Sequence, residues 1–189
     1  SFLQTGDKNL KQLLAVQIGI PVYLDNDSSL IALAELRFGT VRERANVMVI
    51  NIGWGIGLGL ILHHQLFRGN NGFAGEFSHI PLFQNAKLCS CGKTGCLETE
   101  TSLLVAVEKA KEGIRAGKTT TLQLNQLESV EQGVDALSKA ALHGDQFAIE
   151  LFSEAAYNIG RGIAILIHLL NPEVVVLSGR GATAGFILQ

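Results

Sequence analysis

Residues 75–98 read GEFSHIPLFQNAKLCSCGKTGCLE and contain all three cysteines of the 189-residue chain. Three thiolates and an imidazole suit a tetrahedral zinc ion, and the spacing Cys-x-Cys-x4-Cys with its glycines provides the turns that wrap one ion. This clustering argues against a disulfide framework, although three unrelated buried thiols would also account for it. With four protein ligands and no vacant position, the predicted zinc site is structural. Its ligands are His79, Cys89, Cys91 and Cys96.

Carboxylates stand at both ends of this segment. Glu76 lies near its start and Glu98 at its end, so a bound ion would draw both into one locality. Together with Asn26 and Asp27 they offer several acceptors and one amide. Such a set suits a polyhydroxylated ligand, because each hydroxyl can donate to a carboxylate. Glu98 alone would equally begin a helix near residue 100, where the helix dipole favours a carboxylate.

A glycine-rich stretch, GWGIGLG, occupies residues 53–59. Backbone amides that glycine exposes can hold phosphate, which would make this stretch a nucleotide site. Glycines in adjoining strands equally mark a tight turn or a close approach of two backbones. The residues alone leave both interpretations open.

The composition is that of a globular protein. Hydrophobic residues make up 47% of the chain and charged residues 17%, with a mean hydropathy of +0.28, which excludes disordered and collagen-like proteins. The net charge is −2 and charges of both signs are interspersed, so no basic stripe is present to hold a nucleic-acid backbone. No apolar run approaches the ~20 residues that cross a bilayer. We therefore expect a soluble, cytoplasmic protein without a membrane partner.

Hydrophobic periodicity predicts an α/β protein. The expected helices are one capped by Asp7 and closed by Gly19, one capped by Asp27 or Ser28 and ending at Gly39, and three over residues 100–116, 130–143 and 145–170. The expected strands cover residues 20–24, 45–52, about 60–64 with His63 and His64 at a hairpin tip, and 173–179 as a buried parallel strand; residues 67–97 are expected to be loop. Asp27 thus lies at a strand-to-helix junction, the edge of an open α/β sheet where ligands bind.

The run Gly75 to His79, followed after nine residues by the cysteine cluster and Glu98, closely resembles the signature of the ROK family of repressors, uncharacterised reading frames and sugar kinases. The resemblance extends over nearly the whole chain. The other matching segments, in the family's order, are Asn26-Asp27 before Ala32–Glu35, the glycine stretch, Leu66–Glu76, and Leu170-Asn171-Pro172-Glu173 before a valine-rich strand.

The resemblance implies an actin-like, ribonuclease H-like sugar-kinase fold of two lobes, with sugar bound in the cleft between them. Residues 1–44 would belong to the first lobe, and residues 45–189 would form the second lobe with an inserted zinc loop at 76–98. The residues that the family's motifs assign to sugar hydroxyls are Asn26, Asp27, Glu76, His79 and Glu98, and His79 would also ligate zinc. In kinase members, the carboxylate at Asp27 deprotonates the accepting hydroxyl for attack on the γ-phosphate of Mg-ATP. The phosphate-binding positions would be Gly53, Trp54, Gly55 and Gly57.

Several departures favour a regulator. Kinases usually have threonine between the first two glycines, where this chain has Trp54, and an aromatic residue there is similar to xylose- and N-acetylglucosamine-responsive repressors. Ser78 stands where the family usually has glycine. The chain begins with Ser1, without the family's Asp-x-Gly-x-Thr turn or a DNA-reading winged helix-turn-helix, so we expect an excised fragment whose DNA-binding part lies upstream.

The preferred hypothesis is therefore the sugar-effector-binding region of a ROK-type transcriptional repressor, in a homodimer or homotetramer. The alternative is an ATP-dependent, glucokinase-like sugar kinase with Asp27 as general base. A sugar-binding pseudo-kinase without a DNA target is a third interpretation.

Overall fold

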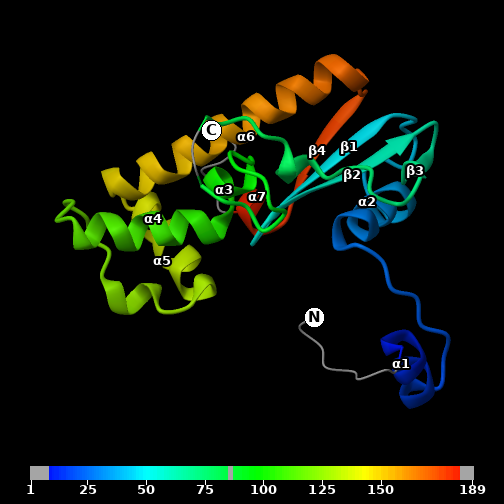
Figure 1. Cartoon of the computed structure of the whole chain (residues 1–189), viewed down its shortest axis with the longest axis horizontal. Coiled ribbons are helices and arrows are strands. Elements are labelled where there is room, and N and C mark those ends of the chain that lie inside the picture. The colour runs from blue at the N-terminus through cyan, green and yellow to red at the C-terminus, as the bar shows by residue number, and fades with distance from the viewer. Residues whose placement is uncertain (1–8, 85–86, 184–189) are drawn as a thin grey trace.

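The computed structural model describes residues 9–84 and 87–183, and its mixed α/β architecture confirms the predicted class. The sheet has the strand order β3-β2-β1-β4; β1 and β2 are antiparallel, as are β2 and β3, whereas β4 is parallel to β1. In Figure 1, α4 and α5 gather at one end of the long helix α6, and the sheet lies toward the other end. The elements are α1 (Leu10–Ile18), α2 (Asp27–Phe38), β1 (Val47–Ile52), β2 (Ile56–Leu62), β3 (Gln65–Phe67), η1 (Phe77–His79), α3 (Glu98–Thr101), α4 (Leu103–Arg115), η2 (Leu124–Leu127), α5 (Val130–Leu142), α6 (Gln146–Leu170), β4 (Val174–Ser178) and α7 (Arg180–Thr183).

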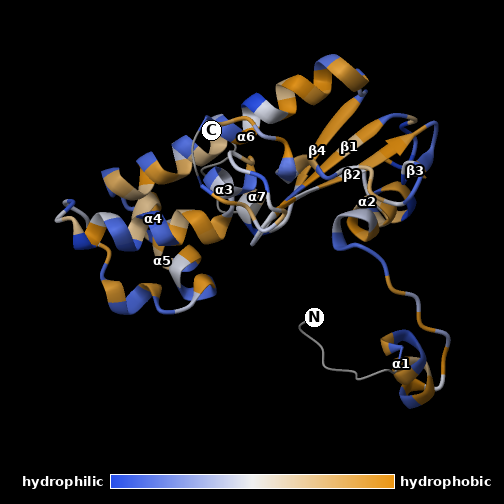
Figure 2. Cartoon of the chain, viewed as in Figure 1, coloured by the Kyte–Doolittle hydropathy of each residue, from blue (hydrophilic) through white to orange (hydrophobic). Residues whose placement is uncertain are grey.

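The central strand β1 is hydrophobic on both faces because a helix covers each of them. Figure 2 shows this as an almost continuous apolar colour along the strands. On one face Val47 and Val49 pack with Ala32 and Leu36 of α2, and on the other Met48, Ile50 and Ile52 pack with Ile159 and Leu166 of α6. β4 is parallel to β1 as predicted, but its residues are half-buried rather than buried. Within the described residues it is an edge strand, so only one side has a neighbouring strand.

Two glycines allow α2 to lie directly on β2. A Cβ atom at Gly57 would come within 1.8 Å of the Ser28 hydroxyl, and one at Gly59 would come within 2.6 Å of the Ser28 carbonyl oxygen and 2.3 Å of Ala32. The second half of the glycine stretch therefore serves close packing of helix on strand. A Cβ at Gly53, in contrast, would meet only one backbone atom, at 3.9 Å.

The same substitution at two glycines should have opposite effects on stability. Gly59→Ala is expected to lower the free energy of unfolding by about 2 kcal/mol, because the methyl group overlaps backbone atoms of α2. Gly160→Ala is the matched control: this glycine lies inside α6 with open space around its Cβ position, so alanine should raise the unfolding free energy by up to ~1 kcal/mol. Urea unfolding of both variants measures the difference, and effects of the same sign would contradict the packing argument.

Helix α6 begins at a buried carboxylate. Asp145 caps it by accepting from the Ala148 amide, and its other oxygen accepts from the Thr120 and Thr121 hydroxyls and the Thr121 amide. Burial alone would raise the pKa of Asp145, but these donors lower it to about 2. The carboxylate thereby joins the loop after α4 to the start of the core helix.

This cap predicts a dependence of stability on pH. The pKa of Asp145 is lower in the folded chain than its ordinary value of 3.8, so its stabilisation is complete above about pH 4 and is lost as pH falls through about 2. Asp145→Asn should therefore lower the unfolding free energy at pH 7 by about 2 kcal/mol, with the difference from the parent shrinking below pH 3. Thermal melts across pH 2–7 measure this, and a constant difference would rule out the charged cap.

Several predicted elements need correction. No strand forms at residues 20–24: Tyr23 is 81% exposed, and these residues pair with no strand of the described chain. The helix expected at 100–116 is divided at Ser102, whose extended backbone ends α3 and whose hydroxyl caps α4. Asp7 lies outside the described residues, and the side chain that caps α1 is Asn9.

Other predictions hold closely. The helices expected at 130–143 and 145–170 are α5 and α6, and His63 and His64 form the turn between β2 and β3. The lobe boundary near residue 44 stays a prediction. None of the helices in the described ranges combines the length and apolarity needed to span a membrane.

Candidate functional site

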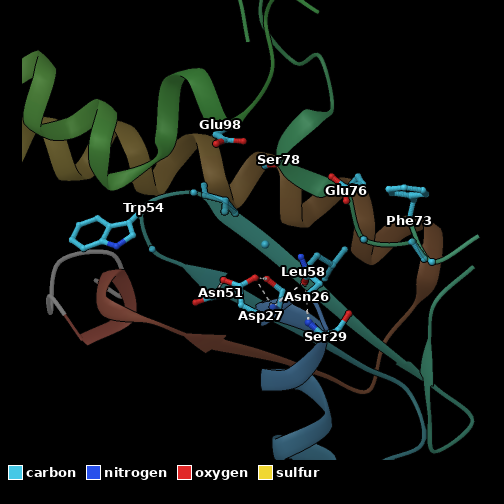
Figure 3. Close-up of a pocket in the computed structure, with 18 of the residues that line it drawn as sticks. Asn26, Asp27, Ser29, Asn51, Trp54, Leu58, Phe73, Glu76, Ser78 and Glu98 are labelled. Atoms are coloured by element: carbon cyan, nitrogen blue, oxygen red, sulfur yellow. Dashed lines mark hydrogen bonds between the residues drawn. The ribbon is translucent and has the colours of Figure 1, made fainter. Parts of the chain in front are cut away.

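A cavity of about 530 Å³ opens at the end of the sheet where β1 turns into β2. Figure 3 shows its polar side chains in two groups, with Glu98, Ser78 and Glu76 on one side and Asn51, Asp27, Asn26 and Ser29 on the other. Trp54 and Phe73 lie at opposite ends of the view. The residues that line the cavity are Asn26–Ser29, Asn51, Gly53–Leu58, Gly72–Glu76, Ser78, Glu98 and Arg180.

Asn26 and Asp27 reach this cavity because α2 begins there. The Asn26 side-chain oxygen accepts from the Ser28 and Ser29 amides, so Asn26 is the helix cap rather than the predicted Asp27 or Ser28. This bonding fixes the Asn26 oxygen on the protein. The Asn26 amide nitrogen is therefore the group that would face a ligand as a donor.

Asn51 is a lining residue that the sequence analysis missed. Its amide nitrogen lies 3.5 Å from the Asp27 Oδ2 atom, while Asp27 Oδ1 accepts from the Ser28 amide at 2.7 Å. Asn51 is a polar residue near the end of an otherwise apolar strand, beside the glycine turn. That interruption is the signal from which the sequence could have identified it.

The predicted metal ligands meet one another, but none of them belongs to the cavity lining. The donor atoms of His79, Cys89, Cys91 and Cys96 all lie within 4.8 Å of one another. Cys91 Sγ is 3.6 Å from Cys96 Sγ, and Cys89 Sγ is 3.4 Å from His79 Nδ1. Ligand atoms around a tetrahedral ion with ~2.3 Å metal–sulfur bonds lie ~3.8 Å apart, so the cluster could hold a metal ion of this type.

The thiols of this cluster differ in pKa. A backbone N–H of Cys91 lowers the pKa of the Cys89 thiol to about 7, whereas burial raises the pKa of Cys96 to about 12. Because a metal binds thiolates, metal uptake by this cluster would release protons. Lower pH should accordingly weaken metal binding.

His79 connects the metal cluster to the cavity. Its Nδ1 atom is on the side of Cys89 and lies 3.6 Å from Glu98 Oε2, and its Nε2 atom lies 3.7 Å from Glu76 Oε2. If Nδ1 held a metal ion, Nε2 would remain directed toward the Glu76 carboxylate. The imidazole therefore lies beside both Glu76 and Glu98, and the expectation that a bound ion draws the two carboxylates together stays a prediction.

Glu98 is held on the short helix α3 by contacts on several sides. Thr99 and Thr101 are buried, and their hydroxyls donate to the carbonyls of Cys96 and Leu97. Lys109 of α4 pairs with Glu100 at 3.1 Å. The helix that carries Glu98 is thus fixed to the cysteine cluster at one end and to the helical layer at the other.

The first half of the glycine stretch forms the turn between β1 and β2. The Gly53 amide donates to the Gly55 carbonyl, so it is not available to a phosphate in this conformation. The guanidinium of Arg180 lies 5.6 Å from the centre of the Trp54 ring and pairs with Asp135 at 2.8 Å. These contacts hold the indole and guanidinium together at this end of the cavity, and sequence reasoning had not connected Arg180 with Trp54.

Comparison with known sequences shows close relatives of two kinds. The sequence model of the ROK family matches residues 3–185. The chain is 30% identical over 184 residues to a putative xylose repressor from Caldicellulosiruptor sp. (strain Rt8B.4), covering 97% of this chain and 46% of the repressor. It is 36% identical over 181 residues to a glucokinase from Halalkalibacterium halodurans, covering 95% of this chain and 54% of the glucokinase.

The fold agrees with these matches. A crystal structure of a ROK family glucokinase from Streptomyces griseus in complex with glucose and AMPPNP has a TM-score of 0.82 to this chain at 34% identity, covering 95% of this chain and 58% of that one. The predicted actin-like sugar-kinase fold is thereby confirmed. The chain spans about half the length of these relatives.

Proposed function

Because the chain belongs to the ROK family, we propose that it is the sugar-binding region of a ROK-type transcriptional repressor. The observation that carries the proposal is the combination of two features in one cavity. The groups suited to sugar hydroxyls, Asp27, Glu76 and Glu98, surround it, while Trp54 occupies the turn where kinases usually carry threonine.

Sugar recognition would use both sides of the cavity. Carboxylates only accept hydrogen bonds, so Glu76, Glu98 and Asp27 suit the hydroxyl donors of a sugar, and the Asn26 amide supplies a donor to a hydroxyl oxygen. The His79 Nε2 atom would add one more polar contact beside Glu76. A ring of such groups discriminates epimers, because an inverted hydroxyl leaves an acceptor unpaired.

Zinc in this proposal is structural. His79, Cys89, Cys91 and Cys96 would hold it with no position left for a substrate. The bound ion would fix the loop between η1 and α3, which is flanked by Glu76 before η1 and by Glu98 at the start of α3. The bound sugar would then contact protein side chains and not the ion.

Trp54 argues against phosphoryl transfer. Its indole N–H is a single donor and cannot replace a threonine hydroxyl, and its 43% exposed ring is held by Arg180. Gly57, in the second half of the stretch, is accounted for by α2 packing. A sensor needs the hydroxyl-binding groups and has no need of a phosphate site.

The alternative is an ATP-dependent sugar kinase, which the glucokinase relatives and the position of Asp27 support. Asp27 would then remove the proton from the accepting hydroxyl, and Mg-ATP would bind near Gly53 and Gly55. This alternative gives no role to the contact between Arg180 and Trp54.

The experiment is a phosphorylation assay on the full-length protein with Mg-ATP and D-glucose, D-xylose or N-acetyl-D-glucosamine. We expect no sugar phosphate above the background of an Asp27→Asn variant. Turnover that Asp27→Asn abolishes while sugar binding persists would establish the kinase instead.

As a repressor region, the chain would act through partners. Sugar binding would shift the equilibrium between open and closed lobes, and closure would change the geometry of a homodimer or homotetramer that carries winged helix-turn-helix heads upstream. Such a protein would work in the cytoplasm, where its operator DNA lies.

A further inference from the structure

Phe73 is the exposed aromatic residue at one end of the sugar cavity. Its side chain is 68% exposed, yet it lines the cavity together with Glu76 and the residues of the α2 N-terminus. Figure 3 shows Phe73 beside Glu76, at the end opposite to Trp54. In the described part of the chain Phe73 has no ring contact such as the one that holds Trp54. Its apolar surface is therefore free to meet a ligand.

The loop that carries Phe73 is fixed at its base. Arg68 pairs with Asp25, next to the α2 cap, with a distance of 2.9 Å between Nη1 and Oδ1, and the Ala74 amide donates to the Arg68 carbonyl. Gly75 has a positive φ of 94°, and a Cβ there would come within 2.3 Å of the Leu58 carbonyl oxygen. The base of the loop therefore lies tightly on β2 and beside α2.

The tip of the same loop has a different character. Gly72 has a φ of 88°, and a Cβ at this position would meet nothing within 4 Å, so the backbone conformation and not crowding favours glycine there. The neighbouring residues Asn70 and Asn71 are exposed and polar. Phe73 is thus an exposed apolar side chain that follows a left-handed glycine at the rim of a cavity lined by carboxylates.

A sugar ring has hydroxyls at its edge and C–H groups on its faces. The carboxylates can accept hydrogen bonds from the hydroxyls at the edge of the ring. They offer no favourable contact to a C–H face that stays in water. We propose that the ring of Phe73 packs against an apolar C–H face of the bound sugar and so strengthens its binding. This inference rests on the proposed sugar-binding function and adds to it an aromatic contact on which affinity depends.

The test is a titration of the full-length protein with D-glucose, D-xylose and N-acetyl-D-glucosamine, followed by NMR. For the sugar that binds the parent best, Phe73→Ala should weaken binding about tenfold, the change expected from exposing one face of a phenyl ring. Phe73→Trp should retain binding, and Phe73→Leu should fall between the two. Phe38→Ala is the matched control, since Phe38 is 87% exposed but lies outside this cavity.

A spectroscopic signature separates contact from a structural effect. In the parent complex the C–H protons of the sugar face should shift upfield from the ring current of Phe73, and Phe73→Leu should abolish the shift. Equal affinity of Phe73→Ala and the parent, or an absent ring-current shift in a complex that forms, would overturn the inference and leave sugar binding intact. A parent protein that binds none of the sugars would overturn the proposed function, and this inference with it.

Discussion

Cys91→Ser is expected to lower the free energy of unfolding by about 2–5 kcal/mol and the melting temperature by ~5–15 °C. Cys91 is exposed, and serine has nearly the same shape, so the substitution removes little packing. Its sulfur lies 3.6 Å from that of Cys96 within the four-residue cluster. If the cluster holds a structural metal ion, the binding free energy of that ion is folding free energy, and loss of one ligand reduces it directly.

Thermal melts and metal analysis together measure this. The parent should contain about one zinc per chain, and a chelator should bring its melting temperature down to that of Cys91→Ser. Thr94→Ser is the control, because Thr94 is an exposed residue of the same loop and lies outside the metal cluster. A Cys91→Ser variant that melts like the parent would show that the cluster is not a structural metal site.

Glu98→Gln is expected to weaken sugar binding about 10- to 100-fold. The change preserves size but replaces an acceptor-only carboxylate by an amide, and a hydrogen bond to a charged group contributes about 1.5–3 kcal/mol. Glu98 lies at the cavity, with Oε2 3.6 Å from His79 Nδ1, and its helix α3 is fixed by Thr99 and Thr101. Stability should therefore change little while affinity falls.

Calorimetric titration with the best-bound sugar measures the effect. Glu131→Gln in the first turn of α5 provides the matched control, because that glutamate is exposed and does not line the cavity. If Glu98→Gln bound sugar as tightly as the parent, the carboxylate of Glu98 would serve only to begin helix α3.

Local patterns predicted those parts of the fold in which one segment determines its own structure. The apolar stripe of residues 145–170 becomes α6, and the valine-rich strand after Pro172 becomes β4, because periodicity and a helix-stopping Asn-Pro pair act locally. The grouping of His79 with the three cysteines was equally predictable. The three cysteines are so close in sequence that their thiols can meet whatever the position of the loop in the fold. Only His79 depends on the path of the chain to reach them.

Features that depend on neighbours could not be predicted in this way. The apolar run at residues 20–24 has the composition of a strand, but a strand needs a partner edge, and composition carries no information about one. Asn51 and Phe73 enter the cavity through the pairing of β1 with β2 and the course of the loop after β3. The glycine stretch had two interpretations, and close approach of α2 decides for packing at Gly57 and Gly59.

The proposal that this cavity is a sugar sensor is tested most directly by calorimetric titration of the zinc-loaded, full-length protein with D-xylose, D-glucose and N-acetyl-D-glucosamine. The account predicts saturable binding of at least one of them, with a stoichiometry of one per chain and no requirement for nucleotide. Absence of binding for all three, in protein that contains its metal and melts cooperatively, would contradict it.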